Sequence, residues 1–490
     1  MELSPQQVLQ MSKGDADIAA HFNVLLTVIQ KQSEQIQKQS EQIEALNVRV
    51  RELERQLGQN SNNSSKPPSS DAYRKPTNLR TPGGKKGAPK GHEGKTLLLA
   101  EHPDEIIVHS PSVCAGCSSP LGAVESSGYE RRQVFDLPPP RIWVTEHRSL
   151  KKCCPFCNLQ QSASFPEQVQ APTQYGDGFA AWTCYLHAYQ MLPLERIAQL
   201  FSDLTGYRPS EATLLSSLQT MSRSLEEAEQ SIRAQLLQNP VVHADETGCR
   251  VEGKTQWMHV MSDANWTLLG VHPKRGSQGM DELGAIPKYT GTLVHDCMSA
   301  YFKEHYSFDH ALCNAHLMRE CQGIAEHDGH RWAERMKELL QGSWKITQKS
   351  RQDNVPLTKD TIQAVKQRYD DILEEGKLEW ANDTVRVKTG TRGRKIKSKA
   401  ANLGERLKIY KESILRFLWD ASIPFDNNQA ERDLRMVKVK QKVSGTFRTE
   451  SGAKVFARMR SVISTLLKQE IPVLSSLTKA IRGQFSFSTT

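Results

Sequence analysis

The sequence predicts a multidomain α/β protein with a coiled coil at its N-terminus, and three observations lead to this class. The chain has 490 residues, which is enough for about three domains. Heptads run through the first 57 residues, and short strands alternate with helices from residue 240 onward. No stretch approaches the ~20 apolar residues that span a bilayer, and the N-terminus lacks the pattern of a secretory signal. We therefore expect neither a membrane protein nor an ordinary secreted protein.

Residues 1–57 carry an apolar residue at every seventh position. The series is Phe22, Ile29, Ile36, Ile43, Val50 and Leu57, and the matching d positions hold Leu25, Gln32, Gln39, Leu46 and Leu53. This repeat predicts a coiled coil (leucine zipper) that joins two or more copies of the chain. The alternative is an amphipathic helix that packs on its own globular domain.

Clustered positive charge indicates a polyanionic partner. The net charge is +9, and residues 58–96 hold eight basic against two acidic residues, with five prolines and six glycines. This composition predicts a flexible basic linker. Residues 385–411 and 431–460 are basic as well. One such run is often only solvated surface, but three in separate contexts favour a nucleic acid. The candidate contacts are Lys85, Lys86, Arg392, Arg394, Lys395, Lys397, Arg432, Arg435 and Lys438.

Residues 105–160 contain two pairs of cysteines at metal-ligand spacing. The pairs are Cys114 with Cys117 and Cys154 with Cys157, and alternating segments typical of short strands lie between them. Four thiolates in two such turns predict a zinc ribbon with a structural zinc ion. A redox pair does not explain two turns, and disulfides are disfavoured without a secretory signal. Cys153 is an alternative ligand in place of Cys154.

Residues 175–240 read as helices. A short turn at 205–209 separates two of them, and Ser210 is placed to cap the second. This arrangement is that of a DNA-reading helix-turn-helix unit and equally that of a plain helical hairpin.

Residues 241–450 read as a mixed α/β domain, with a mainly helical insertion over about 326–420 and a C-terminal helical domain at 451–490. Segments 241–245, 257–261, 266–271 and 291–296 predict strands. Asp245 and Asp296 end the first and last of them, and acids held by strands suit Mg²⁺. Glu246 should face away from Asp245, because side chains alternate along a strand.

The third carboxylate of such a site would come from a helix. Glu431 is the candidate, with Asp433 and Asp426 as rivals. Spacing alone leaves the triad open, because Glu431 has the right distance from Asn428 for a helix-capping pair and from Arg435 for a helical ion pair. Cys313 and His316 stand at a strand-to-helix junction, which more often reflects core packing than a second metal site.

Six strings, in order, resemble bacterial insertion-sequence transposases of the "sixty-six" group (TnpC type). They are residues 63–71 (NSSKPPSSD), 154–157 (CPFC), 243–247 (HADET), 296–301 (DCMSAY), 313–320 (CNAHLMRE) and 426–432 (DNNQAER). The resemblance covers nearly the whole chain. It departs from the family pattern at Met318-Arg319, where two arginines are common, and at Ala115-Gly116, where proline is missing.

The resemblance implies Asp245, Asp296 and Glu431 as a metal-binding triad in an RNase H-like core. The implied function is a DDE transposase that cuts element ends and transfers strands with two Mg²⁺ (or Mn²⁺) ions per active site. The implied partners are double-stranded DNA, a second copy of the chain or a higher oligomer, and accessory proteins encoded by the element. The implied location is the bacterial cytoplasm, at the nucleoid. The alternatives are a non-catalytic DNA-binding repressor or domesticated relative, and a nuclease acting on RNA–DNA hybrids.

Overall fold

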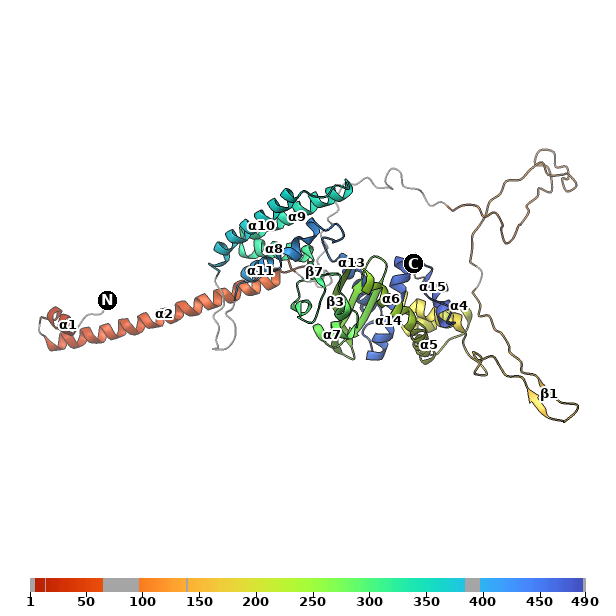
Figure 1. Cartoon of the computed structure of the whole chain (residues 1–490), viewed down its shortest axis with the longest axis horizontal. Coiled ribbons are helices and arrows are strands. Elements are labelled where there is room, and N and C mark those ends of the chain that lie inside the picture. The colour runs from red at the N-terminus through yellow and green to blue at the C-terminus, as the bar shows by residue number, and fades with distance from the viewer. Residues whose placement is uncertain (1–4, 14, 65–96, 138–139, 384–396, 488–490) are drawn as a thin grey trace. The chain divides into compact units, whose positions relative to one another are not determined.

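The computed structural model of the chain describes residues 5–13, 15–64, 97–137, 140–383 and 397–487 (Figure 1). The chain divides into two compact units. The larger comprises Met1–Tyr73, Ala171–Ile197 and Ser210–Thr490, and the smaller comprises Arg74–Gln170 and Ala198–Pro209. The protein is mixed α/β with a helical N-terminal region, in agreement with the predicted class. Among the described residues, no helix is both long and apolar enough to cross a membrane.

The N-terminal region consists of α1 (Pro5–Met11) and the 43-residue helix α2 (Ala16–Gly58). Asp15 caps α2 by accepting hydrogen bonds from two backbone N–H groups of its first turn. The apolar heptad positions are largely exposed, with Ile29 at 59%, Ile36 at 65% and Ile43 at 58%. Within the part of the chain that the structure describes, the apolar stripe is therefore left uncovered along this length.

Part of the predicted linker is ordered against the protein. Residues 65–96 lie outside the described residues, but 58–64 are described and contact helix α8 (Asn314–Asp328). The composition of 58–96 predicts a free tether from residue 58 onward. The structure differs over the first seven residues, because they contact the surface of α8.

Helices follow from residue 177, as predicted. Their bounds are α3 (Asp177–Cys184), a π-helical turn η2 (Tyr185–Tyr189), α4 (Leu194–Thr205), α5 (Glu211–Ser224) and α6 (Glu226–Gln238). The Ser210 side chain accepts a hydrogen bond from the N–H of Thr213 at 3.1 Å, which confirms the predicted cap of α5.

A five-stranded mixed sheet lies at the centre of the larger unit. Its strands are β3 (Val241–Val251), β4 (Lys254–Ser262), β5 (Thr267–His272), β6 (Thr292–His295) and β7 (Asp309–Leu312), in the order β5-β4-β3-β6-β7. β3, β4 and β5 pair antiparallel, whereas β6 runs parallel to β3 and β7 runs parallel to β6. Four of these strands match the predicted segments, and β7 was not predicted. The short elements α7 (Ser277–Glu282), η3 (Ile286–Lys288) and η4 (Ser299–Phe302) lie between strands.

The C-terminal helices cover the sheet. They are α13 (Asn428–Ser444), α14 (Glu450–Lys468) and α15 (Val473–Ile481). α13 packs against β3 and β4, and α14 packs against β5. Two hydroxyls of α14 accept hydrogen bonds from backbone N–H groups of the edge strand β5: Thr465 from Thr267 at 3.1 Å and Ser461 from Leu269 at 2.8 Å. The edge strand is thus protected by a helix.

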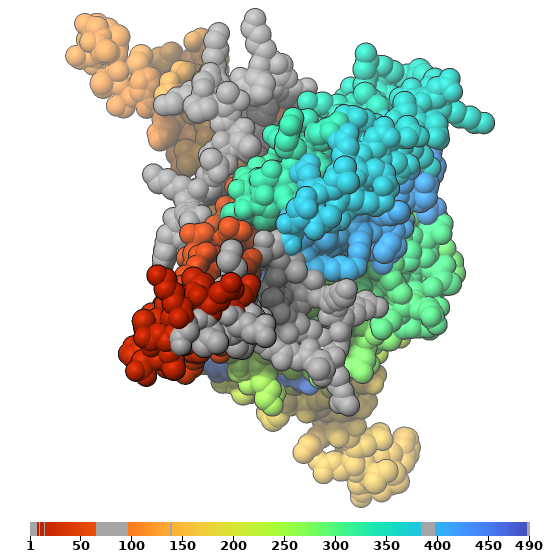
Figure 2. All heavy atoms as spheres, turned by 90° about the vertical axis from the view of Figure 1, so that its left-hand side faces the viewer, coloured from red at the N-terminus to blue at the C-terminus, as the bar shows by residue number. Residues whose placement is uncertain are grey.

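The helical insertion begins at α8, earlier than the predicted residue 326. It continues through α9 (Arg331–Gln352), α10 (Lys359–Trp380), α11 (Lys399–Ile409), α12 (Lys411–Leu415) and η5 (Arg416–Leu418). These helices gather into one mass, coloured teal to light blue in Figure 2. The helices of the insertion form one hydrophobic core together with the last residues of β6 and β7. The insertion is thereby joined to the parallel end of the sheet.

Candidate active site and zinc-binding domain

Asp245 and Asp296 lie on neighbouring parallel strands. His243 of β3 is aligned with Val294 of β6, so two residues further along each strand Asp245 stands beside Asp296, the residue directly after β6. Because side chains alternate along a strand, residues at matching offsets point to the same face. The structure therefore brings together the two acids that the sequence singled out.

Asn427 attaches the start of α13 to β3 at this point. Its Nδ2 donates to the carbonyl of Ala244 at 2.8 Å, and its Oδ1 lies 2.8 Å from Nδ1 of His243. Its backbone N–H donates to Sγ of Cys313 at 3.2 Å. Asn427 is 1% exposed. This anchor places Glu431, in the first turn of α13, beside the strand that carries Asp245.

The three carboxyl groups are each partly buried. Burial and the neighbouring charges of Glu246, Asp296 and Glu431 raise the pKa of Asp245 well above its usual value. Burial also raises the pKa of Asp296 and that of Glu431. Oε1 of Glu431 is buried without a hydrogen-bond partner. Three carboxylates near one another are the ligand type that a hard cation prefers, and a bound cation would relieve their repulsion. Among the described residues, however, the ligand oxygens of Asp245, Asp296 and Glu431 do not all come within 4.8 Å of one another.

Two side chains from the first turns of α8 face Glu431. Arg319 Nη2 lies 3.6 Å from Glu431 Oε1, and His316 Nε2 lies 3.9 Å from the same oxygen. The arginine in these contacts is thus Arg319 and not Arg435, which helical spacing suggested as the ion-pair partner of Glu431. Arg319 is the single arginine that remains where the resembling family commonly has two.

Cys313 and His316 contact each other beside Glu431. Burial raises the pKa of the Cys313 thiol to about 12 and lowers that of His316 to about 4, so both groups are neutral. His316 Nδ1 lies 3.3 Å from Cys313 Sγ. The thiol can donate to Nδ1, which leaves the Nε2 proton on the side of Glu431. Cys313, His316 and Glu431 each offer one ligand atom, and these three atoms lie within 4.8 Å of one another. The two ring nitrogens of His316, however, already face different partners, Cys313 and Glu431.

The rival acids have other roles. Asp433 is 9% exposed, and its Oδ2 pairs with Lys468 of α14 at 2.8 Å. Asp426 accepts a hydrogen bond from the N–H of Asn428 at 3.0 Å. Asn428 is the first residue of α13 rather than its cap, so the expected capping pair of Asn428 with Glu431 is not formed.

Glu246 and Arg275 form an ion pair next to the acids. Arg275 Nε donates to Glu246 Oε1 at 2.8 Å, and the Tyr301 hydroxyl donates to Oε2 at 3.1 Å. Burial and the charge of Asp296 raise the pKa of Glu246 to about 7. The Arg275 guanidinium also lies over the ring of Trp257 at 4.9 Å. The sequence carried no signal for Arg275, because it stands in a connection between strands.

The predicted DNA contacts are found in several settings. Arg432 and Arg435 are exposed on α13. Lys438 donates to the carbonyl of Gly248 and so ties α13 to β3. Lys397 pairs with Glu405. The remaining candidates lie outside the described residues: Lys85, Lys86, Arg392, Arg394 and Lys395.

Both cysteine pairs of the smaller unit adopt the same turn. In each, the first cysteine accepts a hydrogen bond from the N–H four residues later: Ser118 to Cys114 at 2.8 Å and Asn158 to Cys154 at 3.0 Å. Ser118 and Asn158 both have positive φ, 58° and 54°. The second turn lies in a hairpin of β1 (Lys151–Cys153) and β2 (Gln160–Ser162).

Hydrogen bonds in these turns favour the thiolate form of one cysteine in each pair. Hydrogen bonding by Ser119 lowers the pKa of Cys117, and the backbone N–H of Phe156 lowers that of Cys154. Each pair therefore fits zinc. In the part of the chain that the structure describes, the four ligand sulfurs do not all come within 4.8 Å of one another. Large apolar side chains in between are exposed, Val134 at 92% and Trp143 at 78%, so this unit has little core of its own.

The chain matches three protein-family models. A model described as "Transposase IS66 family" covers residues 172–455, which is more than half of the chain. A model described as "zinc-finger binding domain of transposase IS66" covers residues 111–158 and includes both cysteine pairs. A family of unknown function covers residues 20–97. No match was found among curated proteins.

Proposed function

Because the chain belongs to the IS66 family of transposases, we propose that it cuts the ends of an insertion sequence and joins them to target DNA by DDE chemistry. The observation that supports the proposal is that Asp245 and Asp296 stand side by side on neighbouring strands, with Glu431 of α13 near enough for its charge to act on Asp245. The reaction class is hydrolysis of one phosphodiester bond, followed by transesterification. The freed 3′-hydroxyl attacks a phosphodiester of target DNA, becomes joined to the target's 5′-phosphate and releases a target 3′-hydroxyl.

In this proposal Asp245, Asp296 and Glu431 hold two Mg²⁺ (or Mn²⁺) ions. When bound, such ions activate the attacking oxygen and neutralise charge on the phosphate. The protein's own part is to hold the carboxylates in place: the sheet positions the two aspartates, and Asn427 with Arg319 positions Glu431. Arg275, half-exposed beside the acids, is a candidate contact to the DNA phosphate.

The remaining parts fit the same function. We propose that the five-stranded sheet, with three antiparallel strands followed by two parallel ones, is an RNase H-like core. The family match at 111–158 supports a structural zinc ion and a DNA-binding role for the smaller unit. The exposed apolar stripe of α2 suits a coiled coil with a second copy, which would keep the two active sites of a transposition complex together.

The test is strand cleavage by purified full-length variants on DNA that carries the element's ends. Asp245→Asn, Asp296→Asn and Glu431→Gln should each abolish cleavage while leaving DNA binding largely unchanged, because each removes a ligand charge at nearly constant volume. Asp433→Asn is the matched control: it should lower stability through the lost Lys468 pair, but the folded fraction should still cut.

Two results would contradict this assignment. Full cleavage by Glu431→Gln would move the third ligand to Asp433 or Asp426. Binding of the ends without cleavage by the unmodified protein, at any Mg²⁺ or Mn²⁺ concentration, would favour the non-catalytic repressor.

A further inference from the structure

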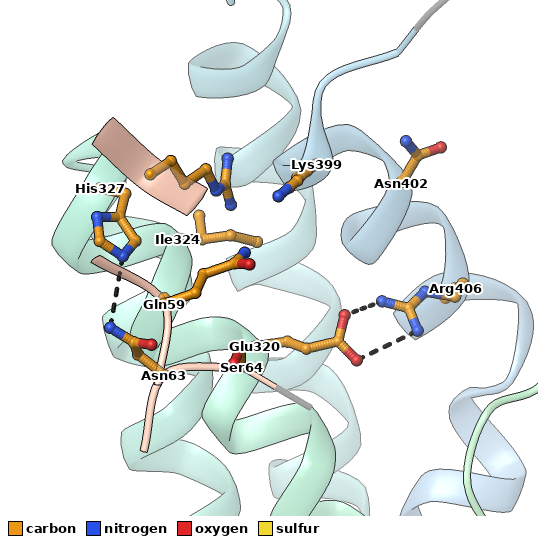
Figure 3. A pocket seen from close by; sticks show the side chains of 11 residues that line it. Gln59, Asn63, Ser64, Glu320, Ile324, His327, Lys399, Asn402 and Arg406 are labelled. Atoms are coloured by element: carbon orange, nitrogen blue, oxygen red, sulfur yellow. Dashed lines mark hydrogen bonds and ion pairs between the residues drawn. The ribbon is translucent and has the colours of Figure 1, made fainter. Parts of the chain in front are cut away.

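The residues directly after α2 make a specific contact with the insertion helix α8. Asn63 is 5% exposed and Ser64 is 8% exposed, which is unusual for a polar segment of this composition. Asn63 Nδ2 donates to Oε2 of Glu326 at 2.8 Å. Arg55, in the last turn of α2, forms an ion pair with Asp328 at 2.9 Å. Figure 3 shows Asn63 against His327 at this contact.

The segment is folded on itself as well as against α8. The Asn63 Oδ1 atom accepts from the N–H of Asn60 at 2.8 Å, and Asn63 Nδ2 also lies 3.2 Å from the carbonyl of Gly58. The Ser64 hydroxyl donates to the carbonyl of Asn60 at 2.6 Å. These bonds define a compact turn over residues 58–64, which we call the docking turn.

Two glycines make the close approach possible. A Cβ atom at Gly323 of α8 would lie 2.2 Å from the backbone oxygen of Asn63, and one at Gly58 would lie 2.6 Å from Cε1 of His327. Only glycine accommodates such distances without movement of the neighbour. Glycine in a helix is otherwise unfavourable, so a contact that requires Gly323 accounts for its presence in α8.

Helix α8 connects this contact with the candidate active site. Its first turns carry His316 and Arg319, which face Glu431, and its last turns carry Gly323, Glu326 and Asp328. Its 15 residues span about 22 Å at 1.5 Å per residue. Arg406 of α11 hydrogen-bonds Glu320 midway along α8 (Figure 3), which braces the helix within the insertion.

We propose that the docking turn is an intramolecular joint that fixes the zipper helix to the insertion through α8. Each catalytic unit is then held at a set orientation to the zipper helix. The joint itself does not depend on the proposed function; only its consequence for pairing DNA ends does.

The decisive variant is Gly323→Ala in the full-length protein. Alanine favours the helix that contains it, so α8 should remain folded while its methyl group displaces Asn63. Gly342→Ala in α9 of the same insertion is the matched control, because a Cβ there meets nothing within 4 Å. The first readout is hydrogen exchange of the backbone amides of residues 58–64, measured without DNA. We expect protection to fall by about tenfold or more in Gly323→Ala and to stay unchanged in Gly342→Ala.

A charge exchange provides an independent test of the same joint. Arg55→Asp and Asp328→Arg should each lower protection of residues 58–64, and the double variant should restore it, because the ion pair is re-formed in reverse. Unchanged protection in Gly323→Ala together with unchanged protection in both charge variants would overturn the joint.

The consequence for DNA is measured separately. Gly323→Ala should reduce complexes that contain two element ends while single-end binding persists. If exchange responds as expected but paired-end complexes do not change, the joint stands and its role in assembly is refuted. If the unmodified protein neither pairs nor cuts ends, the proposed function fails while the exchange result still decides the joint.

Discussion

Replacement of Asn427 by alanine tests how the candidate active site is assembled. The buried Asn427 side chain links the start of α13 to β3 through Ala244 and His243. Alanine keeps the backbone bond to Cys313 but leaves one carbonyl and one imidazole nitrogen buried and unpaired. Each such group costs about 1–3 kcal/mol, so we expect Asn427→Ala to lower the free energy of unfolding by about 2–6 kcal/mol.

The same change should impair catalysis in the protein that remains folded. Glu431 lies one turn after Asn427, so loss of the link releases the carboxylate from its position beside Asp245. A displacement of about 1 Å at a reacting centre costs on the order of 100-fold in rate. We therefore expect strand cleavage per folded molecule to fall by about that factor.

Urea unfolding followed by circular dichroism measures the stability, and cleavage of end-bearing DNA measures the rate. Asn428→Ala is the control, because it leaves the bonds of Asn427 to β3 in place. The Asn428 side chain is exposed, and surface substitutions usually change stability by less than about 0.5 kcal/mol. Equal stability and equal cleavage rates for the two variants would refute the view that Asn427 positions Glu431.

Two further predictions concern a buried charge and the zinc-binding unit. Lys440 is 5% exposed, and burial lowers its pKa to about 8 from 10.5. Between these pH values the unfolded chain binds more protons than the folded one, so the free energy of unfolding should rise with pH. Lys440→Met should remove this rise and increase the free energy of unfolding by about 1–3 kcal/mol at pH 7. An unchanged pH dependence in urea unfolding would count against the buried charge. Zinc should co-purify at about one ion per chain, be lost in Cys154→Ser and be retained in Cys153→Ser; a reduced, folded protein without zinc, or zinc loss in Cys153→Ser, would contradict the ligand set.

The sequence by itself determined the elements whose signals are local. The heptads of α2, the alternation of the strands and the cap at Ser210 each depend on residues within one or two turns. The same is true of the two cysteine turns, whose ligand spacing is a local pattern. Asp245 and Asp296 were found for a related reason, because an acid at the end of an apolar strand is visible in the chain itself.

Only the tertiary structure decided which groups surround these acids. Asn427 bonds to a strand 183 residues away, and Arg319 meets Glu431 across 112 residues. Arg275 and Glu246 are paired over a loop that has no sequence pattern. The polar residues 58–64 read as linker by composition, yet Asn63 and Ser64 among them are buried, and Gly323 leaves room for Asn63 on α8. Such contacts depend on shape and on the partner surface, and neither is written in the periodicity of a single segment.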